Sequence, residues 1–109
     1  MELLRKRVRI SPPPLKQINM TAKVRQMTSN RSGRPVANQF VIYTNYGTYF
    51  QSYDSVIALR DNNGKITLDD YYWDYSRTTS KYRNEFLGEG IADTRVKIES
   101  GEYKLADLN

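Results

Sequence analysis

The sequence predicts an α+β domain, in which an antiparallel β-meander of four to five strands is followed by two short C-terminal helices that pack on the sheet. Three observations support this prediction. Residues 39–69 contain four runs of strand-like composition. Two turn signals, at residues 45–47 and 63–64, separate these runs in pairs. After residue 75 the spacing of the large side chains changes to three and four, as on one side of a helix, and strands followed by helices are typical of α+β proteins.

The first predicted hairpin joins "QFVIYT" to "TYFQSY" through residues 45–47. A three-residue turn that ends in a left-handed glycine suits this stretch. That register would place Tyr43 opposite Tyr49 on one face of the sheet and Ile42 opposite Phe50 on the other.

The second predicted hairpin joins "SVIALRD" to "KITLD" through Asn63-Gly64, the strongest short hairpin signal. A two-residue turn here would pair Leu59 with Leu68, an apolar match that a slip of one residue would destroy. The weak alternation of "AKVRQMTS", residues 22–29, predicts a further strand ahead of a loop at "NRSGRP".

A first helix is predicted from a stripe of large side chains spaced four, three and four residues apart, at Tyr75, Thr79, Tyr82 and Phe86. Ser76 or Thr78 would cap its start, and Gly88 would end it. In this interpretation Tyr82 and Phe86 bury against the sheet, and Trp73 and Tyr75 clamp the end of the preceding strand.

The opposite side of this helix is predicted to face solvent, with Lys81 and Arg83 exposed. A second, shorter helix is predicted within "DTRVKIESG", with Asp93 or Thr94 as N-cap and Gly101 past its C-terminus. The closing "EYKLADL" is consistent with a short extended segment.

Composition excludes several classes of site. The 109 residues contain no cysteine, which excludes disulfides, iron–sulfur clusters and thiolate zinc sites. They contain no histidine, the commonest general base and metal ligand. No apolar run is long enough to span a membrane and no signal peptide is recognisable, so we expect a cytoplasmic protein without membrane association.

The charge is distributed unevenly. Residues 1–35 hold nine cations and one carboxylate, whereas residues 36–109 hold eight cations and eleven carboxylates. We therefore divide the chain into a basic, proline-containing N-terminal arm, residues 1–21, and a single α+β domain, residues 22–109. Such asymmetry is typical of proteins that bind nucleic acid or another polyanion, although a solvated terminus that keeps the protein soluble is equally consistent with it. The candidate phosphate-binding residues are Arg5, Lys6, Arg7, Arg9, Lys16, Lys23, Arg25, Arg31 and Arg34.

Three tyrosines of the predicted meander, Tyr43, Tyr49 and Tyr53, are candidates for stacking on unpaired bases. A twisted sheet also needs cover on its second face, and a helix that carries Tyr82 and Phe86 could bury the same rings. Both interpretations remain open from the sequence.

No catalytic, cofactor or metal site is predicted. "RDNNGKITLDD" resembles a calcium loop but has Leu59 in place of the first carboxylate. Asp69, Asp70 and Asp74 lack a supporting magnesium motif, and acidic side chains at a strand end are usually solvated. The hydroxyls of residues 76–80 lack an adjacent base and are more typical of helix caps. The sequence therefore predicts a protein that is not an enzyme.

Four stretches, "SGRPVANQF", "YFQSYDSVIA", "WDYSRTTSKYRNEFLGE" and "ESGEYKLADLN", resemble a group of small proteins of unknown function encoded by bacteriophages and bacterial mobile elements. The resemblance covers about residues 32–109. Its most recognisable part is an aromatic-Asp-Tyr-Ser run followed by Thr-Thr, Lys-Tyr and Phe-Leu. It implies expression in an infected cell, and a role in phage DNA handling or in blocking a host protein.

The first functional hypothesis is accordingly a non-enzymatic accessory protein of a phage or mobile element that binds nucleic acid through its basic arm and the adjacent loop. A second, from another class, is an inhibitor that binds a host defence protein. A third is a minor structural or assembly component of a phage. The sequence decides neither between DNA and RNA nor the oligomeric state.

Overall fold

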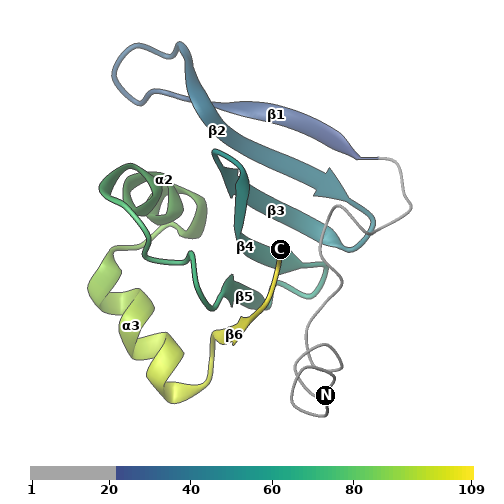
Figure 1. The fold of residues 1–109 in the computed structure, drawn as a ribbon, viewed down its shortest axis with the longest axis vertical. Coiled ribbons are helices and arrows are strands. Elements are labelled where there is room, and N and C mark those ends of the chain that lie inside the picture. The colour runs from purple at the N-terminus through teal and green to yellow at the C-terminus, as the bar shows by residue number, and fades with distance from the viewer. Residues whose placement is uncertain (1–21) are drawn as a thin grey trace.

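Backbone hydrogen bonds join six segments of the chain into one sheet in the computed structural model, which describes residues 22–109 (Figure 1). The class and the two helices are as predicted, but the sheet has six strands instead of four to five. The predictions made for residues 1–21 lie outside the described residues. In chain order the elements are β1 (Lys23–Thr28), β2 (Pro35–Thr44), β3 (Gly47–Ser52), β4 (Ser55–Asp61), β5 (Ile66–Asp69), α2 (Arg77–Leu87), α3 (Ile91–Ser100) and β6 (Lys104–Ala106).

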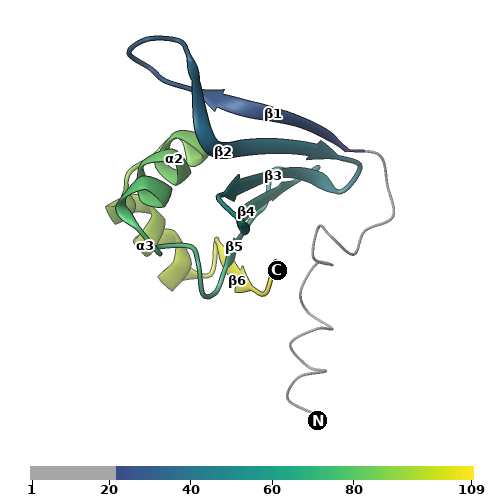
Figure 2. The same cartoon turned by 45° about the horizontal axis from the view of Figure 1, so that its top comes forward.

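Strands β1 to β5 pair antiparallel with their neighbours in sequence, as in the predicted meander. Strand β6 instead pairs parallel with β5 and matches Leu105 with Leu68. A parallel pair needs a long crossover connection, and both helices lie in this connection. Figure 2 shows that they cover one face of the sheet only.

The register of the first hairpin differs from the predicted one by one residue. Thr44 pairs with Gly47, so the turn has two residues, and Ile42 pairs with Tyr49. The Thr44 hydroxyl stabilises this turn, because it donates to the Gly47 carbonyl (2.9 Å) and accepts from the Tyr46 N–H (3.1 Å).

Gly47 begins β3, and its φ of 137° is accessible to glycine but to few other residues. A second reason for glycine here is the close approach of β4. A Cβ atom on Gly47 would lie 2.8 Å from the Cα of Asp61 and still closer to the carbonyl oxygen of Arg60. Both the backbone conformation and the contact between strands therefore require glycine at this position.

The second hairpin also departs from its predicted register. Asp61 donates its N–H to the carbonyl of Lys65, so three residues form the turn, with Gly64 at a φ of 83°. Leu59 consequently pairs with Thr67, and Leu68 pairs with Ala58. The sequence predicts three residues in the first turn and two in the second, whereas the structure has two and three.

These registers give the sheet two buried faces. Residues directly opposite each other on paired strands share a face. The face toward the helices carries Phe50, Ala58 and Leu68 and packs against Tyr82 and partly buried side chains of both helices. The second face carries Ile42, Tyr49, Val56 and Leu59 and includes Leu108 from the C-terminal segment.

The prediction that Tyr49 shares a face with Tyr43 is therefore wrong. Tyr49 pairs with Ile42 and Leu59, and its exposed fraction is 0%. Burial raises the pKa of its hydroxyl. The reason is the two-residue turn, because a shift of one residue moves every side chain of a strand to the other face.

Helix α2 begins and ends as predicted. The Ser76 hydroxyl accepts the N–H of Thr79 (3.2 Å), and Gly88 follows the last turn in a left-handed conformation. Helix α3 begins three or four residues earlier than expected, with Gly90 as N-cap in place of Asp93 or Thr94, and Gly101 follows its C-terminus as expected.

Helix α2 packs on the sheet through Tyr82 and Phe86, which confirms their predicted side. The rings of Phe86 and Phe50 stack with their centroids 5.8 Å apart. Trp73 is half-buried against the same core. Tyr75 lies outside the helix and is exposed, so its predicted clamping contact is wrong.

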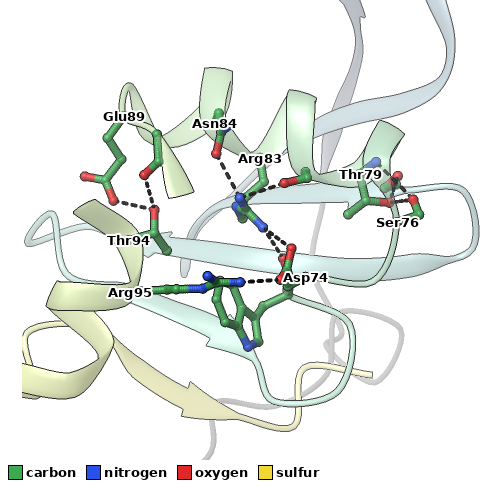
Figure 3. Close-up of polar contacts among 12 residues, drawn as sticks. Asp74, Ser76, Thr79, Arg83, Asn84, Glu89, Thr94 and Arg95 are labelled. Carbon is green, nitrogen blue, oxygen red and sulfur yellow. Dashed lines mark hydrogen bonds and ion pairs between the residues drawn. The ribbon is translucent and has the colours of Figure 1, made fainter. Parts of the chain in front are cut away.

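Arg83 was predicted to face solvent, yet its side chain is fully buried (Figure 3). The guanidinium donates to the Trp73 carbonyl (2.7 Å), to Ser80 and Asn84 (2.9 Å each) and to Asp74 (3.3 Å). Burial lowers the pKa of Arg83, while the hydrogen bond to Asp74 raises it. Arg83 is buried because residues 73 and 74 fold back over this side of the helix. Lys81 is exposed, as predicted.

A second polar cluster joins the two helices to the start of β6. The carboxylate of Glu89 accepts hydrogen bonds from Lys97 (2.6 Å), Thr94 (2.7 Å) and Tyr103 (3.0 Å). Burial raises the pKa of Glu89, but these three hydrogen bonds outweigh it and the net pKa is lowered. The cluster fixes the angle at which α3 follows α2, and Figure 3 shows the contact between Glu89 and Thr94.

Asp69, at the end of β5, holds the C-terminal segment against the sheet. Its carboxylate accepts the N–H groups of Tyr71 and Tyr72 on one side, and the Leu108 N–H and the Asn109 side-chain amide on the other. Asn109 also bonds both backbone groups of Val56. A carboxylate considered for magnesium is therefore a buried structural acceptor.

Candidate nucleic-acid interface

The β1–β2 hairpin, residues 22–44, combines cations with a complete lack of carboxylates. In the sequence no aspartate or glutamate occurs between Glu2 and Asp54. The hairpin carries four cations, which are Lys23, Arg25, Arg31 and Arg34. Because β3 pairs only with residues 39–44 of β2, the other end of the hairpin projects past the sheet in both views (Figures 1 and 2).

The loop at this projecting end, residues 29–34, is held by serine hydroxyls. Ser29 accepts the N–H groups of Arg31 (3.1 Å) and Ser32 (3.3 Å), and Ser32 accepts that of Arg34 (3.2 Å). The Ser29 N–H donates to the Arg34 carbonyl (2.9 Å). The backbone is thus fixed by its own turn residues, and both arginine side chains remain exposed.

A groove of about 650 Å³ runs between this hairpin and the C-terminal half of α2. The strand pairs place Arg25 opposite Val41 and Lys23 opposite Tyr43, so these side chains share the face turned toward the helix. Met27 and Val41 supply apolar surface, Arg25 and the exposed ring of Tyr43 lie beside them, and Glu85 lines the helix side. The groove therefore offers a cation and an aromatic ring next to each other.

Within residues 22–109, no carboxylate forms an ion pair with a hairpin cation, although Glu85 lines the same groove as Arg25. Among residues 22–109, ion pairs join Arg83 and Arg95 to Asp74 and Lys97 to Glu89, and none involves the hairpin. Unpaired cations on a segment without carboxylates attract phosphate groups at long range.

The structure places the predicted site residues in three groups. Lys23, Arg25, Arg31 and Arg34 lie together on the hairpin, and Tyr43 lines its groove. Tyr53 is exposed but lies at the β3–β4 turn, and Tyr49 is buried in the second face. The remaining candidates, Arg5, Lys6, Arg7, Arg9 and Lys16, lie outside the described residues.

Sequence reasoning missed the other components of the groove. Met27 and Val41 were assigned to strands but not to a binding surface, and Glu85 was not considered. The alternation of Lys23, Arg25 and Met27 could have indicated a shared face of β1. Nothing local in the sequence indicates that Glu85 of α2 lies across from it, because that contact is tertiary.

Within residues 22–109 no group of three or more carboxylates is arranged to hold a metal ion. Among the hydroxyls of residues 76–80, that of Ser76 caps α2 by accepting the Thr79 N–H and also bonds the Thr79 hydroxyl. Neither helix described here has the length and apolar character needed to cross a bilayer.

Comparison with known proteins identifies a family but no activity. The model of a family of unknown function, DUF8033, matches residues 22–103. No curated protein and no solved structure matches the chain. The match spans β1 to α3 and therefore includes both the hairpin and the helices of the groove.

Proposed function

Because the chain belongs to the family of unknown function DUF8033, whose description names no activity, we propose a function from the surface itself: non-enzymatic binding of nucleic acid through the β1–β2 hairpin. The observation that carries this proposal is that the hairpin holds four cations and no carboxylate, and that none of the four is ion-paired within the described residues. The basic N-terminal arm precedes this hairpin directly in sequence and adds five further cations.

Phosphate binding is the chemistry that this surface supports best. Arginine side chains bind phosphate oxygens in pairs of hydrogen bonds, and the three hairpin arginines lie on a loop and a strand with a fixed backbone. Tyr43 adds an exposed ring beside Arg25. Contacts of this kind position a nucleic acid without reading its sequence, so we expect weak sequence preference.

A salt titration of the full chain, followed by fluorescence anisotropy, tests the proposal. If four to six phosphates are neutralised, the affinity should fall on the order of a hundredfold between low and moderate salt. Replacing Arg25, Arg31 and Arg34 by alanine together should reduce the slope of log affinity against log salt by about two to three. Deleting residues 1–10 should weaken binding to all sequences about equally.

The matched control removes three exposed cations elsewhere, through alanine at Lys65, Arg77 and Lys104. Its net charge equals that of the hairpin variant, so a nonspecific effect of charge would lower both affinities alike. An affinity that does not change with salt concentration would contradict the proposal. So would an equal loss of affinity in the two triple variants.

The resemblance to phage and mobile-element proteins described above extends the proposal to an accessory role during infection. An alternative from another class is inhibition of a host protein. It is favoured by the exposed rings of Tyr71 and Tyr75, which contact each other with their centroids 6.2 Å apart and offer an aromatic surface outside the hairpin. Binding that is insensitive to salt, but is lost when these tyrosines are replaced, would support this alternative.

A further inference from the structure

A second cavity, of about 360 Å³, lies between the β3–β4 turn and the N-terminal turn of α2. Its walls are three tyrosines, Tyr53, Tyr72 and Tyr75, together with five serine and threonine hydroxyls and the side chain of Ile57. No charged side chain lines it. The volume is near the lower end of the range for small-ligand sites, which suits a single uncharged ring system.

The tyrosines present ring surface to this cavity. The rings of Tyr72 and Tyr75 meet edge to face with their centroids 5.2 Å apart, and Tyr75 keeps 63% of its surface exposed. Tyr53 has a φ of 56°, which is unusual for a bulky residue. Its N–H donates to the Asn38 carbonyl (2.7 Å), and this bond fixes the turn from which the ring extends.

Two of the hydroxyls are available to a ligand. Ser52 and Thr79 bond each other (2.9 Å), and Ser76 caps the helix. By contrast, the hydroxyls of Ser55 and Thr78 bond no other group among residues 22–109. Serine and threonine hydroxyls both donate and accept, so they can bond the polar edge of a planar ring.

The position of the cavity connects it to the basic hairpin. Tyr53 is bonded to Asn38, which lies four residues after Arg34 along β2. At about 3.4 Å per residue this separation is at most roughly 14 Å. A stacked strand carries one phosphate per about 3.4 Å, so about four nucleotides would bridge the two.

We infer that this cavity receives an unpaired base of a single-stranded nucleic acid whose phosphates lie on the β1–β2 hairpin. The inference rests on the proposed function and narrows it, because bases inside a duplex cannot enter the cavity. Single-strand binding proteins commonly combine a cationic path with aromatic rings on which bases stack. No lysine or arginine lines the cavity, so it would bind the base, and the phosphates of the backbone would lie outside it.

The test compares four labelled probes of equal length by fluorescence anisotropy: oligothymidylate, oligouridylate, an abasic DNA strand and a DNA duplex. The full chain should bind oligothymidylate or oligouridylate at least about tenfold more tightly than the abasic strand. Tyr75→Ala should remove most of this difference and leave binding of the abasic strand unchanged. Tyr75→Phe should retain it, because stacking needs the ring and not the hydroxyl.

The matched control is Tyr46→Ala. Tyr46, like Tyr75, is an exposed tyrosine outside the helices and strands, but it lies in the turn before β3, whereas the cavity is at the other end of that strand, beside Tyr53. Thermal melts of both variants verify that they are folded. The two single-stranded probes distinguish RNA from DNA as the source of the base.

The outcomes separate the two proposals. Salt-dependent binding of the abasic strand with no gain from bases, or equal effects of Tyr75→Ala and Tyr46→Ala, would overturn the base site and leave the hairpin function standing. Failure of every probe to bind would overturn both.

Discussion

Arg83 and Arg95 share one carboxylate but differ in burial, and this pair offers a sharp test of the packing between helices and strands. Both donate to Asp74 at 3.3 Å, while their side chains are 0% and 62% exposed. Arg83 makes three more hydrogen bonds, to Trp73, Ser80 and Asn84. We expect Arg83→Ala to be strongly destabilising and Arg95→Ala to be nearly neutral.

The magnitude follows from what each substitution leaves behind. Arg83→Ala leaves the Trp73 carbonyl and the side chains of Ser80 and Asn84 without their donor, at about 1–3 kcal/mol for each buried group, or about 3 kcal/mol or more together. Asp74 is 36% exposed and keeps one cation in either variant, and an exposed pair such as Arg95–Asp74 contributes about 0–1 kcal/mol. Against a total stability of about 5–15 kcal/mol, the first loss threatens folding. For a domain of this size it should lower Tm by at least about 12 °C. Arg83→Lys should lie between, because an ammonium cannot reproduce the planar fork of donors.

Thermal and urea denaturation of the three variants, followed by circular dichroism, measures these differences. Equal melting temperatures for Arg83→Ala and Arg95→Ala would refute the reasoning. They would mean that the buried guanidinium and its hydrogen bonds contribute no more to stability than the exposed one. A stabilised Arg83→Ala protein would show that the cost of desolvating the charge exceeds the gain from its four hydrogen bonds.

Three further predictions concern the core, a strand contact and the acid range. Gly47→Ala should cost about 3 kcal/mol or more through collision with the backbone at Arg60, whereas Gly90→Ala, which has open space, should cost less than about 1 kcal/mol in the same urea titration. Phe86→Ala should cost about 2–4 kcal/mol, a little below the value for a fully buried ring, and calorimetry that finds under about 1 kcal/mol would contradict its packing. Because the folded-state pKa of Glu89 is lowered from 4.5, its contribution to stability is present above that pH and is lost as the pH falls through the lowered value. Glu89→Gln should therefore destabilise the protein at pH 7 but much less near pH 3, and equal losses at both pH values in denaturant titrations would refute this linkage.

The hairpins could be predicted from sequence because their signals are local, but their registers could not. Turn length depends here on contacts beyond the turn. Gly47 is required by the backbone of β4, which the residues around it do not reveal. The two-residue turn places Tyr49 in the core. The three-residue turn predicted from the sequence would have placed it on the same face as Tyr43, as a candidate for stacking on bases.

Helix α2 shows the same division between local and tertiary information. Its cap at Ser76 and the inward side of Tyr82 follow from short-range patterns and were predicted. The burial of Arg83 follows from the path of residues 73 and 74, which no periodicity encodes. Polar side chains on the outer side of a predicted helix are exposed only if no other segment covers them.

The candidate surface was predictable in its charge but not in its shape. Composition alone located the cations of the hairpin, since charge asymmetry needs no fold. Neither the groove beside Tyr43 nor the cavity beside Tyr75 could be inferred, because each lies between α2 and a strand or turn distant in sequence.

The parallel pairing of β6 has a consequence for the order in which the chain folds. Strands β1 to β5 close through short turns, and such local contacts form quickly. The free edge of β5 can receive its partner only after residues 70–103, which include both helices, have been synthesised, because these residues precede β6 in the chain. Until then that edge exposes unpaired backbone groups, which is where sheets aggregate or exchange strands between molecules. Synthesis proceeds from the N-terminus, so the meander with the basic hairpin emerges before β6, and the edge of β5 stays unpaired until β6 follows.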